Sequence, residues 1–287
     1  MAEYANVNGV RTWYAERGQG EPLVLLHGGF SDARDFAGNL DGLAARFRVF
    51  SPERRGHGHT PDVDGPITLD LMAEDLIAFL GKVVDEPAHL AGYSVGGTVA
   101  LLVALRRPDL VRRLVLISAV FHNTGWIVTP SKGGEWPEQV LAAYAEVSPD
   151  GRDHFEVVVG KIVKAAEAQP LSLTEADLAG IDARTLVMTG DGDIVHLEHT
   201  LALYRALRES ELAVVPGTSH VLLHEKPELC ARLVEAFLTE DFPNGRAAHR
   251  SRDSPGSSMH VLPTTPMGLH SAALAQLQGL PLSLTPG

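Results

Sequence analysis

The stretch Gly92-Tyr93-Ser94-Val95-Gly96-Gly97 decides the fold of this chain. It has the form G-x-S-x-G, follows a short apolar run, and opens a helix-like segment at Gly97–Arg106. Strand, sharp turn and helix in this order form a nucleophile elbow, a turn that pushes a serine out of the sheet. The glycines have a mechanical reason, because bulky residues would clash at such a turn. The motif alone fits two interpretations about equally well: Ser94 as an exposed nucleophile, or an ordinary strand–helix turn in which the serine caps the helix.

Short apolar runs and helix-period segments alternate on both sides of this elbow. The runs predict eight strands, at Tyr4–Val7, Val10–Ala15, Pro22–His27, Arg48–Ser51, His89–Gly92, Leu114–Ser118, Thr185–Thr189 and Leu212–Val215. The other segments predict helices at Leu69–Leu80, Gly97–Arg106, Glu198–Leu207 and Pro227–Leu238. The first two strands form a hairpin around Asn8-Gly9. Strands that alternate with helices indicate a mostly parallel sheet with helices on both faces.

Two parts of the chain depart from this alternation. Residues 121–180 contain no strand pattern but fit helices at Glu135–Glu146 and Arg152–Ala168, which predicts a helical cap inserted into a core of residues 1–120 and 181–242. Residues 243–287 are rich in Pro, Ser and Gly, and Asp253 is their only acidic residue. Such a segment lacks the apolar content to pack well, so we expect a poorly ordered tail with a weak helix at Met267–Leu280.

Composition limits the setting in which the protein works. The 287 residues are 45% hydrophobic and 21% charged, with a net charge of −12, which is typical of a soluble protein that repels nucleic acid. No signal peptide or membrane-length apolar stretch is visible. The single cysteine, Cys230, cannot form an intrachain disulfide and has a core position on a helical pattern. These features predict a cytoplasmic protein without nucleic-acid or membrane partners, and leave the oligomeric state open.

A serine nucleophile needs a base, and the base needs a carboxylate to orient it. His220 lies on a loop after the strand Leu212–Val215, where the base is expected. Asp191 and Asp193 both follow the strand Thr185–Thr189, and both are candidates for the acid. The chain order Ser, Asp, His is that of α/β-hydrolases and differs from the orders in chymotrypsin-like and subtilisin-like enzymes.

The oxyanion of a tetrahedral intermediate needs hydrogen-bond donors. The N–H of Val95, directly after the nucleophile, is one donor, and the loop His27-Gly28-Gly29-Phe30 is expected to supply the other. His27 itself is interpreted as structural. Phe30 and Tyr93 adjoin these groups, so we expect them to contact substrate together with Trp126 from the cap.

Together these motifs resemble the α/β-hydrolase superfamily, in the branch of small bacterial esterases, lactonases and cofactor-free haloperoxidases. The resemblance runs from Asn6 to about Phe242 and includes Arg55-Gly56-His57-Gly58 and Glu225-Lys226-Pro227. It implies the α/β-hydrolase fold: a mostly parallel eight-stranded sheet, helices on both faces and a short helical cap.

The resemblance also assigns residues. The family's acid stands three residues after the loop glycine, which favours Asp193 over Asp191. The family's first oxyanion donor matches Gly29, with Phe30 as the adjacent alternative. Two departures are that Glu53 stands where the family usually has Asp, and Thr60 where it often has Ser. No carboxylate follows the strand Leu114–Ser118, the family's alternative position for the acid.

Metal and nucleotide chemistry find little support in the sequence. Close histidine pairs occur, but the sequence sets no third ligand for any of them: His57 and His59, His196 and His199, His220 and His224. No glycine-rich phosphate loop with a lysine is present. We therefore expect no metal and no cofactor.

The leading functional hypothesis is hydrolysis of a small-molecule carboxylic ester or lactone through an acyl-enzyme, with Ser94, His220 and Asp193 as the triad. One alternative is cleavage of a carbon–carbon bond in a diketone-like substrate by the same residues. Another is a ligand-binding or signalling protein with slow turnover on the same fold. Fold alone does not choose among these functions.

Overall fold

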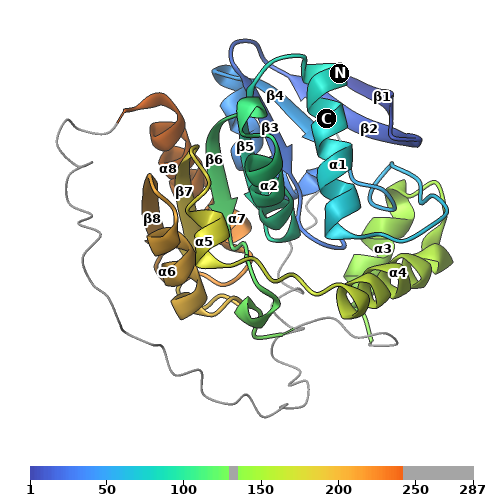
Figure 1. Cartoon of the computed structure of the whole chain (residues 1–287). Coiled ribbons are helices and arrows are strands. Elements are labelled where there is room, and N and C mark those ends of the chain that lie inside the picture. The colour runs from blue at the N-terminus through green and yellow to red at the C-terminus, as the bar shows by residue number, and fades with distance from the viewer. Residues whose placement is uncertain (129–134, 242–287) are drawn as a thin grey trace.

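Eight strands form one sheet in the computed structural model, which describes residues 1–128 and 135–241 (Figure 1). The strands are β1 (Ala2–Val7), β2 (Val10–Arg17), β3 (Pro22–Leu26), β4 (Arg48–Pro52), β5 (Ala88–Tyr93), β6 (Val111–Ile117), β7 (Arg184–Gly190) and β8 (Ser210–Val215). Their order across the sheet is β1-β2-β4-β3-β5-β6-β7-β8. β2 pairs antiparallel with β1 and β4, and all other pairs are parallel. The predicted mostly parallel eight-stranded sheet is therefore confirmed.

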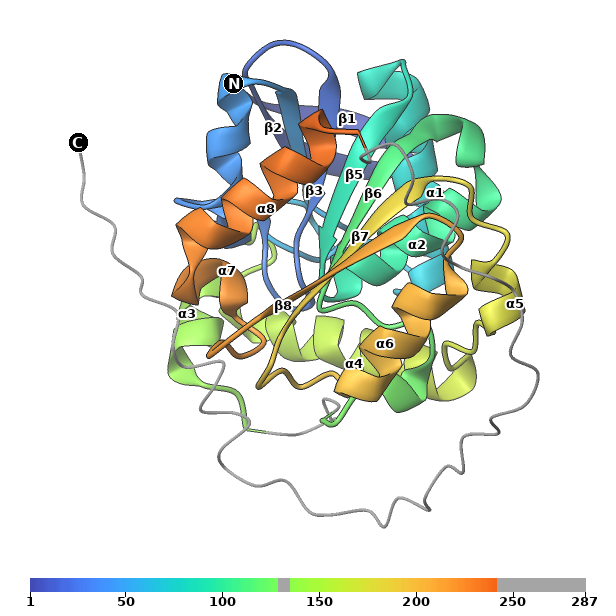
Figure 2. The same cartoon turned by 90° about the vertical axis from the view of Figure 1, so that its left-hand side faces the viewer.

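Helices cover both faces of this sheet (Figure 2). They are α1 (Leu69–Phe79), α2 (Val95–Arg106), α3 (Glu138–Val147), α4 (Phe155–Ala168), α5 (Glu175–Leu178), α6 (Leu197–Ala206), α7 (Leu222–Glu225) and α8 (Pro227–Thr239). α1, α2 and α6 pack on one face, and α8 packs on the other together with a 3₁₀ turn at Leu40–Ala45.

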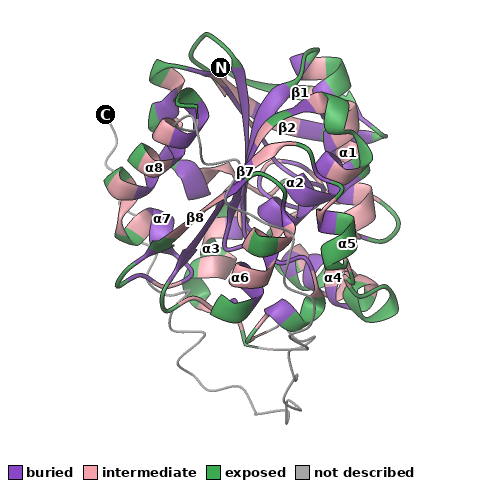
Figure 3. Ribbon diagram, turned by 60° about the vertical axis from the view of Figure 1, so that its left-hand side comes forward, coloured by how far each residue is buried: buried purple, intermediate pink, exposed green. Residues whose placement is uncertain are grey.

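The central strands are buried on both sides, as Figure 3 shows by their purple colour. Successive residues of a strand point to opposite faces. In β3, Val24 and Leu26 accordingly pack toward α1 and α2, whereas Leu23 and Leu25 pack toward α8. This explains why the parallel strands appear in the sequence as continuous apolar runs rather than as alternating patterns.

The segment between β6 and β7 adds no strand to the sheet within its described residues, and it holds α3, α4 and α5. α3 and α4 lie beyond the carboxyl ends of the parallel strands (Figures 1 and 2). α3 begins three residues later than expected because Pro137 precedes its first turn. Asp62 ties α4 to the core by accepting hydrogen bonds from Lys161 Nζ at 2.5 Å and His154 Nε2 at 2.8 Å.

The predicted tail at 243–287, with its weak helix, lies outside the described residues, so its order stays a prediction. Among the helices that the structure describes, none combines the length and apolar character needed to cross a membrane.

Candidate active site

The predicted site residues gather at the carboxyl edge of the parallel strands. β3 and β5 are neighbours, with Leu26 paired to Gly92, so the loop after β3 lies beside Ser94. The loops after β7 and β8 carry Asp193 and His220 to the same edge. Chain order reverses at β3, which lies between β4 and β5, and ligands of open α/β sheets bind at such a switch point.

Ser94 occupies a backbone conformation that only a tight turn imposes. Its φ and ψ are 54° and −122°, and its N–H donates to Ile117 O at 2.7 Å. The turn presses α2 against β3, so a Cβ on Gly96 would lie 2.1 Å from Leu26 O. Glycine at this position is therefore required by contact with the neighbouring strand as well as by the turn.

A line of hydrogen bonds connects Ser94, His220 and Asp193. Ser94 Oγ lies 3.1 Å from His220 Nε2, and His220 Nδ1 lies 2.7 Å from Asp193 Oδ1. An ionised carboxylate only accepts hydrogen bonds, so Nδ1 carries the proton and the lone pair of Nε2 faces the serine hydroxyl. Such an arrangement can take the serine proton and so turn a weak nucleophile into a strong one.

Asp193 is held as a carboxylate by four donors. Oδ1 accepts from Val195 N at 3.1 Å as well as from His220, while Oδ2 accepts from Thr189 Oγ1 at 2.9 Å and from Ser118 Oγ. Burial opposes ionisation of Asp193, but the hydrogen bond and charge of His220 and the two hydroxyls outweigh it, so the pKa is lowered. Sequence reasoning missed Ser118 and Thr189, and treated the end of β6 only as a position without a carboxylate.

Asp191, the other candidate acid, has a different contact. Its Oδ1 accepts from Thr218 N at 3.0 Å and so joins the loop after β7 to the loop that carries His220. The structure therefore brings Asp193, and not Asp191, to the histidine.

The loop after β3 presents free backbone donors beside the serine. A Cβ on Gly29 would lie 3.0 Å from Val95 Cγ2, so the two predicted donor residues are in contact. Within the described part of the chain, the N–H groups of Gly29 and Phe30 have no hydrogen-bond partner. The N–H of Val95 is free as well, because it is the first residue of α2. Phe30 has φ of 59°, which turns the loop sharply at this point.

Asp35, which sequence reasoning also missed, holds this loop from below. Its Oδ2 accepts from Gly28 N at 2.8 Å and Ser31 Oγ at 2.6 Å. Burial raises its pKa to about 6, against the effect of these two hydrogen bonds.

Aromatic rings surround the site. Trp126 lies edge-on to His220 with ring centroids 6.0 Å apart, and Phe30 packs 4.8 Å from Trp136 and 6.1 Å from Phe155. Tyr93, expected to contact substrate, donates its hydroxyl to His220 O at 3.0 Å, and its ring lies tilted against the imidazole with ring centroids 5.2 Å apart. Its polar group thus supports the histidine loop.

The expectation that Ser94 is exposed is wrong. Ser94 and His220 are only 6% and 5% exposed. The segment after β6 turns back over this edge of the sheet, and Trp126 forms an isolated bridge with Val195 beside the acid. The Ser94 side chain is therefore largely shielded from solvent.

His57 and His199, one residue from each of two histidine pairs, have contacts with the backbone. Burial lowers the pKa of His57 to about 3, and its Nδ1 lies 2.9 Å from Arg55 O. Burial lowers the pKa of His199 to about 4, and its Nε2 accepts from Phe121 N at 3.1 Å. Within residues 1–128 and 135–241, no group of three or more potential ligands is arranged to hold a metal ion.

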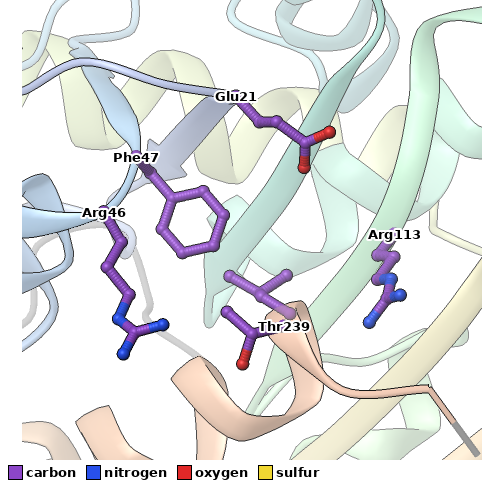
Figure 4. Close-up of a pocket in the computed structure, with 6 residues that line it drawn as sticks. Glu21, Arg46, Phe47, Arg113 and Thr239 are labelled. Atoms are coloured by element: carbon purple, nitrogen blue, oxygen red, sulfur yellow. The ribbon is translucent and has the colours of Figure 1, made fainter.

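A separate hollow of about 440 Å³ does not include these residues, and Figure 4 shows the side chains that line it. It is lined by Glu21, Arg46, Phe47, Arg113, Leu238 and Thr239. Glu21, Phe47 and Arg113 stand at the amino ends of β3, β4 and β6, so the hollow opens at the opposite edge of the sheet from Ser94. Its cations are already paired: Arg46 Nε contacts Glu235 at 2.7 Å, and Arg113 contacts Asp241 at 2.7 Å.

The fold and this arrangement define a family. Residues 23–233 match the model of the alpha/beta hydrolase family, so the chain belongs to that family and is a hydrolase. A 2-hydroxymuconate semialdehyde hydrolase from Pseudomonas putida is 28% identical over 260 residues, which are 81% of this chain and 92% of the relative.

Two further matches differ in what their names say they act on. An sn-1-specific diacylglycerol lipase from Mus musculus is 26% identical, over 75% of this chain and 80% of the relative. Among solved structures, a serine hydrolase involved in carbazole degradation superposes with a TM-score of 0.70 at 23% identity, over 83% of this chain and 98% of that chain. The structural match supports the fold alone.

Proposed function

We propose that this protein hydrolyses short carboxylic esters or lactones through an acyl-enzyme. The observation that supports this most directly is the hydrogen-bonded line from Asp193 through His220 to Ser94, with the free N–H groups of Gly29 and Val95 beside it. Nucleophile, base, orienting acid and oxyanion donors are the four parts that acyl transfer needs.

In the first half of the reaction, His220 Nε2 takes the proton of Ser94 as Oγ bonds to the carbonyl carbon. The carbonyl oxygen becomes an oxyanion that accepts hydrogen bonds from the N–H groups of Gly29 and Val95. Asp193 stabilises the imidazolium ion. His220 then gives its proton to the departing alkoxide, which leaves as the alcohol and yields the acyl-enzyme.

In the second half, a water molecule takes the place of the departed alcohol and attacks the acyl-enzyme. His220 removes a proton from the water molecule while the water oxygen attacks the acyl carbon. The second tetrahedral intermediate collapses, the carbon–Oγ bond breaks, and Ser94 recovers its proton from His220. The acid is released.

The surroundings of Ser94 favour small substrates. Ser94 is buried, Trp126 lies edge-on to His220, and Phe30 belongs to the adjacent loop of the proposed oxyanion donors, where it packs on Trp136. We expect p-nitrophenyl acetate or butyrate to be hydrolysed with higher kcat/KM than the palmitate ester, and a fluorophosphonate to label Ser94. A kcat/KM that rises steadily with chain length would contradict the size argument, and labelling elsewhere would contradict the nucleophile.

The relationship to the Pseudomonas putida semialdehyde hydrolase keeps cleavage of a carbon–carbon bond as the second candidate. A panel of esters, lactones and 1,3-diketones compared by kcat/KM distinguishes the two reactions. Labelling of Ser94 without turnover of any member would instead favour a ligand-binding role.

A further inference from the structure

Arg54 is a buried cation beneath the oxyanion loop that the mechanism above does not use. It directly follows Glu53 in the loop between β4 and α1, and it is only 8% exposed. Its Nη1 donates to His27 O and its Nη2 to Gly28 O, both at 2.5 Å. Its backbone N–H donates to His27 Nε2 at 3.2 Å.

These contacts fix both sides of Gly28. The N–H of Gly28 donates to the carboxylate of Asp35, and its carbonyl accepts from Arg54. His27 Nε2 accepts from the Arg54 N–H, and His27 Nδ1 lies 2.9 Å from Gly28 O and 3.0 Å from Arg54 Nη2, so the imidazole packs between the guanidinium and the loop. The Gly28 carbonyl therefore accepts from a charged donor.

The same peptide group carries the oxyanion donor. No cis peptide bond occurs in the described residues, so the C=O of Gly28 and the N–H of Gly29 point in opposite directions. Anchoring the carbonyl on Arg54 therefore aims the Gly29 N–H away from the guanidinium. A charged donor on the carbonyl also polarises the amide and makes its N–H a stronger donor.

Filling space in the core would not by itself account for an arginine at position 54. The structure records no ion pair for Arg54 among the residues that it describes, and its Nε is buried without a partner. Burial lowers its pKa to about 9, although the charge of Asp35 works in the opposite direction. Burying an unpaired charge is costly, whereas an apolar residue would fill this space without that cost.

We propose that Arg54 is a positioning residue of the oxyanion hole, which orients and polarises the Gly28–Gly29 peptide so that the Gly29 N–H stabilises the oxyanion. The inference rests on the proposed serine-hydrolase function. Arg54 acts through the peptide and does not touch substrate.

The test compares Arg54→Gln and Arg54→Lys with a matched control at the next residue. Arg55 is also buried, but its guanidinium pairs with Asp75 on α1 at 2.8 Å and makes no hydrogen bond to residues 27–30 within the described part of the chain. Arg55→Gln thus removes a buried charge from the same loop without changing the Gly28 carbonyl. Three quantities are measured for each full-length variant: kcat and KM for p-nitrophenyl butyrate, the rate of Ser94 phosphonylation by a fluorophosphonate, and the thermal midpoint.

We expect Arg54→Gln to lower kcat per labelled site by about 10- to 100-fold, somewhat less than loss of a whole oxyanion donor, while KM changes less than about threefold. Phosphonylation should slow in parallel, because the phosphonyl oxygen uses the same donors. Arg54→Lys keeps the charge and should recover part of the loss. Arg55→Gln should lower the thermal midpoint but leave kcat per labelled site unchanged.

An unchanged kcat per labelled site in Arg54→Gln, or a loss equal to that of Arg55→Gln, would overturn the proposal. If Arg54→Gln does not fold, Arg54→Lys provides the test, because its single ammonium group cannot bind both carbonyls as the guanidinium does. A wild-type kcat and a wild-type phosphonylation rate in Arg54→Lys would then overturn the proposal. If the wild-type protein hydrolyses no ester, the proposed function fails, but the phosphonylation rates still test the role of Arg54.

Discussion

Replacing Asp193 by asparagine tests the hydrogen-bonded line in a way specific to this site. An amide has one oxygen and one NH₂ group where the carboxylate has two accepting oxygens. His220 Nδ1 and Val195 N approach Oδ1, and the hydroxyls of Ser118 and Thr189 approach Oδ2. Hydroxyl groups can rotate to accept, but the N–H of Val195 cannot. The amide NH₂ should therefore face the hydroxyls and leave the oxygen toward His220.

This orientation sets the size of the expected loss. The proton stays on Nδ1 of His220, so Asp193→Asn keeps the productive tautomer and loses the stabilising charge. A unit charge about 4 Å from the imidazolium contributes about 4 kcal/mol at an effective dielectric constant near 20. That corresponds to a loss of about 10³ in kcat. If the side chain instead adopts the opposite orientation, with its NH₂ group toward His220, the imidazole takes the wrong tautomer and kcat falls by about 10⁴.

Steady-state kinetics with p-nitrophenyl butyrate measure the loss, and Ser118→Ala provides the second arm of a double-mutant cycle. Alone, Ser118→Ala removes one of four donors to Asp193 and should lower kcat less than about tenfold. Added to Asp193→Asn, it should cost more, because the amide loses a hydroxyl that accepts from it. Asp191→Asn is the control, since its carboxylate contacts Thr218. Additive losses, or a larger loss in Asp191→Asn than in Asp193→Asn, would refute the reasoning.

Three further predictions concern the stability of the protein and its C-terminal tail. Burial raises the folded-state pKa of Asp35 to about 6, so the folded state binds the proton more tightly than the unfolded state, and the free energy of unfolding should fall as pH rises from about 4 to 6. Urea titrations at several pH values should show that Asp35→Asn removes this pH-dependent part of the stability, which amounts to up to about 3 kcal/mol. A pH profile identical to that of wild type would contradict the prediction. Gly96→Ala would place Cβ 2.1 Å from Leu26 O, so its thermal midpoint should drop well below that of wild type, by an amount equivalent to at least about 2 kcal/mol, and an unchanged midpoint would contradict the close approach. A chain that ends at Phe242 should keep its thermal midpoint and its kcat/KM, and loss of soluble expression would show that the tail is needed.

The sequence predicted the features that local patterns encode. The elbow at Ser94 depends on glycines within four residues, and the buried strands depend on short apolar runs, so both are visible without a structure. Contacts made by the register of distant segments are not visible. Ser118 reaches Asp193 across 75 residues because β6 and β7 are neighbours, and Arg54 reaches Gly28 because β4 and β3 are neighbours. The burial of Ser94 was missed for the same reason, since a segment distant in sequence covers it.

Backbone strain marks the same edge of the sheet as the chemistry. Five non-glycine residues have positive φ within the described residues. Asn8 lies in the first hairpin and Asp85 ends the helical segment after α1, both common places for this conformation. The other three are Phe30, Ser94 and Ser118, which follow the adjacent strands β3, β5 and β6.

Each of these three residues carries or supports a group of the proposed reaction. Phe30 turns the loop of the proposed oxyanion donors, Ser94 is the proposed nucleophile, and the Ser118 hydroxyl donates to Asp193, the proposed acid. Such conformations cost of order 1–3 kcal/mol each and persist only where the surroundings hold them in place. Here the holding contacts are the Ser94 N–H on Ile117 O and the Ser118 N–H on Met188 O, both bonds to neighbouring strands. The rigid sheet thus holds the strained residues where the proposed acyl transfer would need them, which explains why the candidate site lies at the strand ends and not on the helices that cover the sheet.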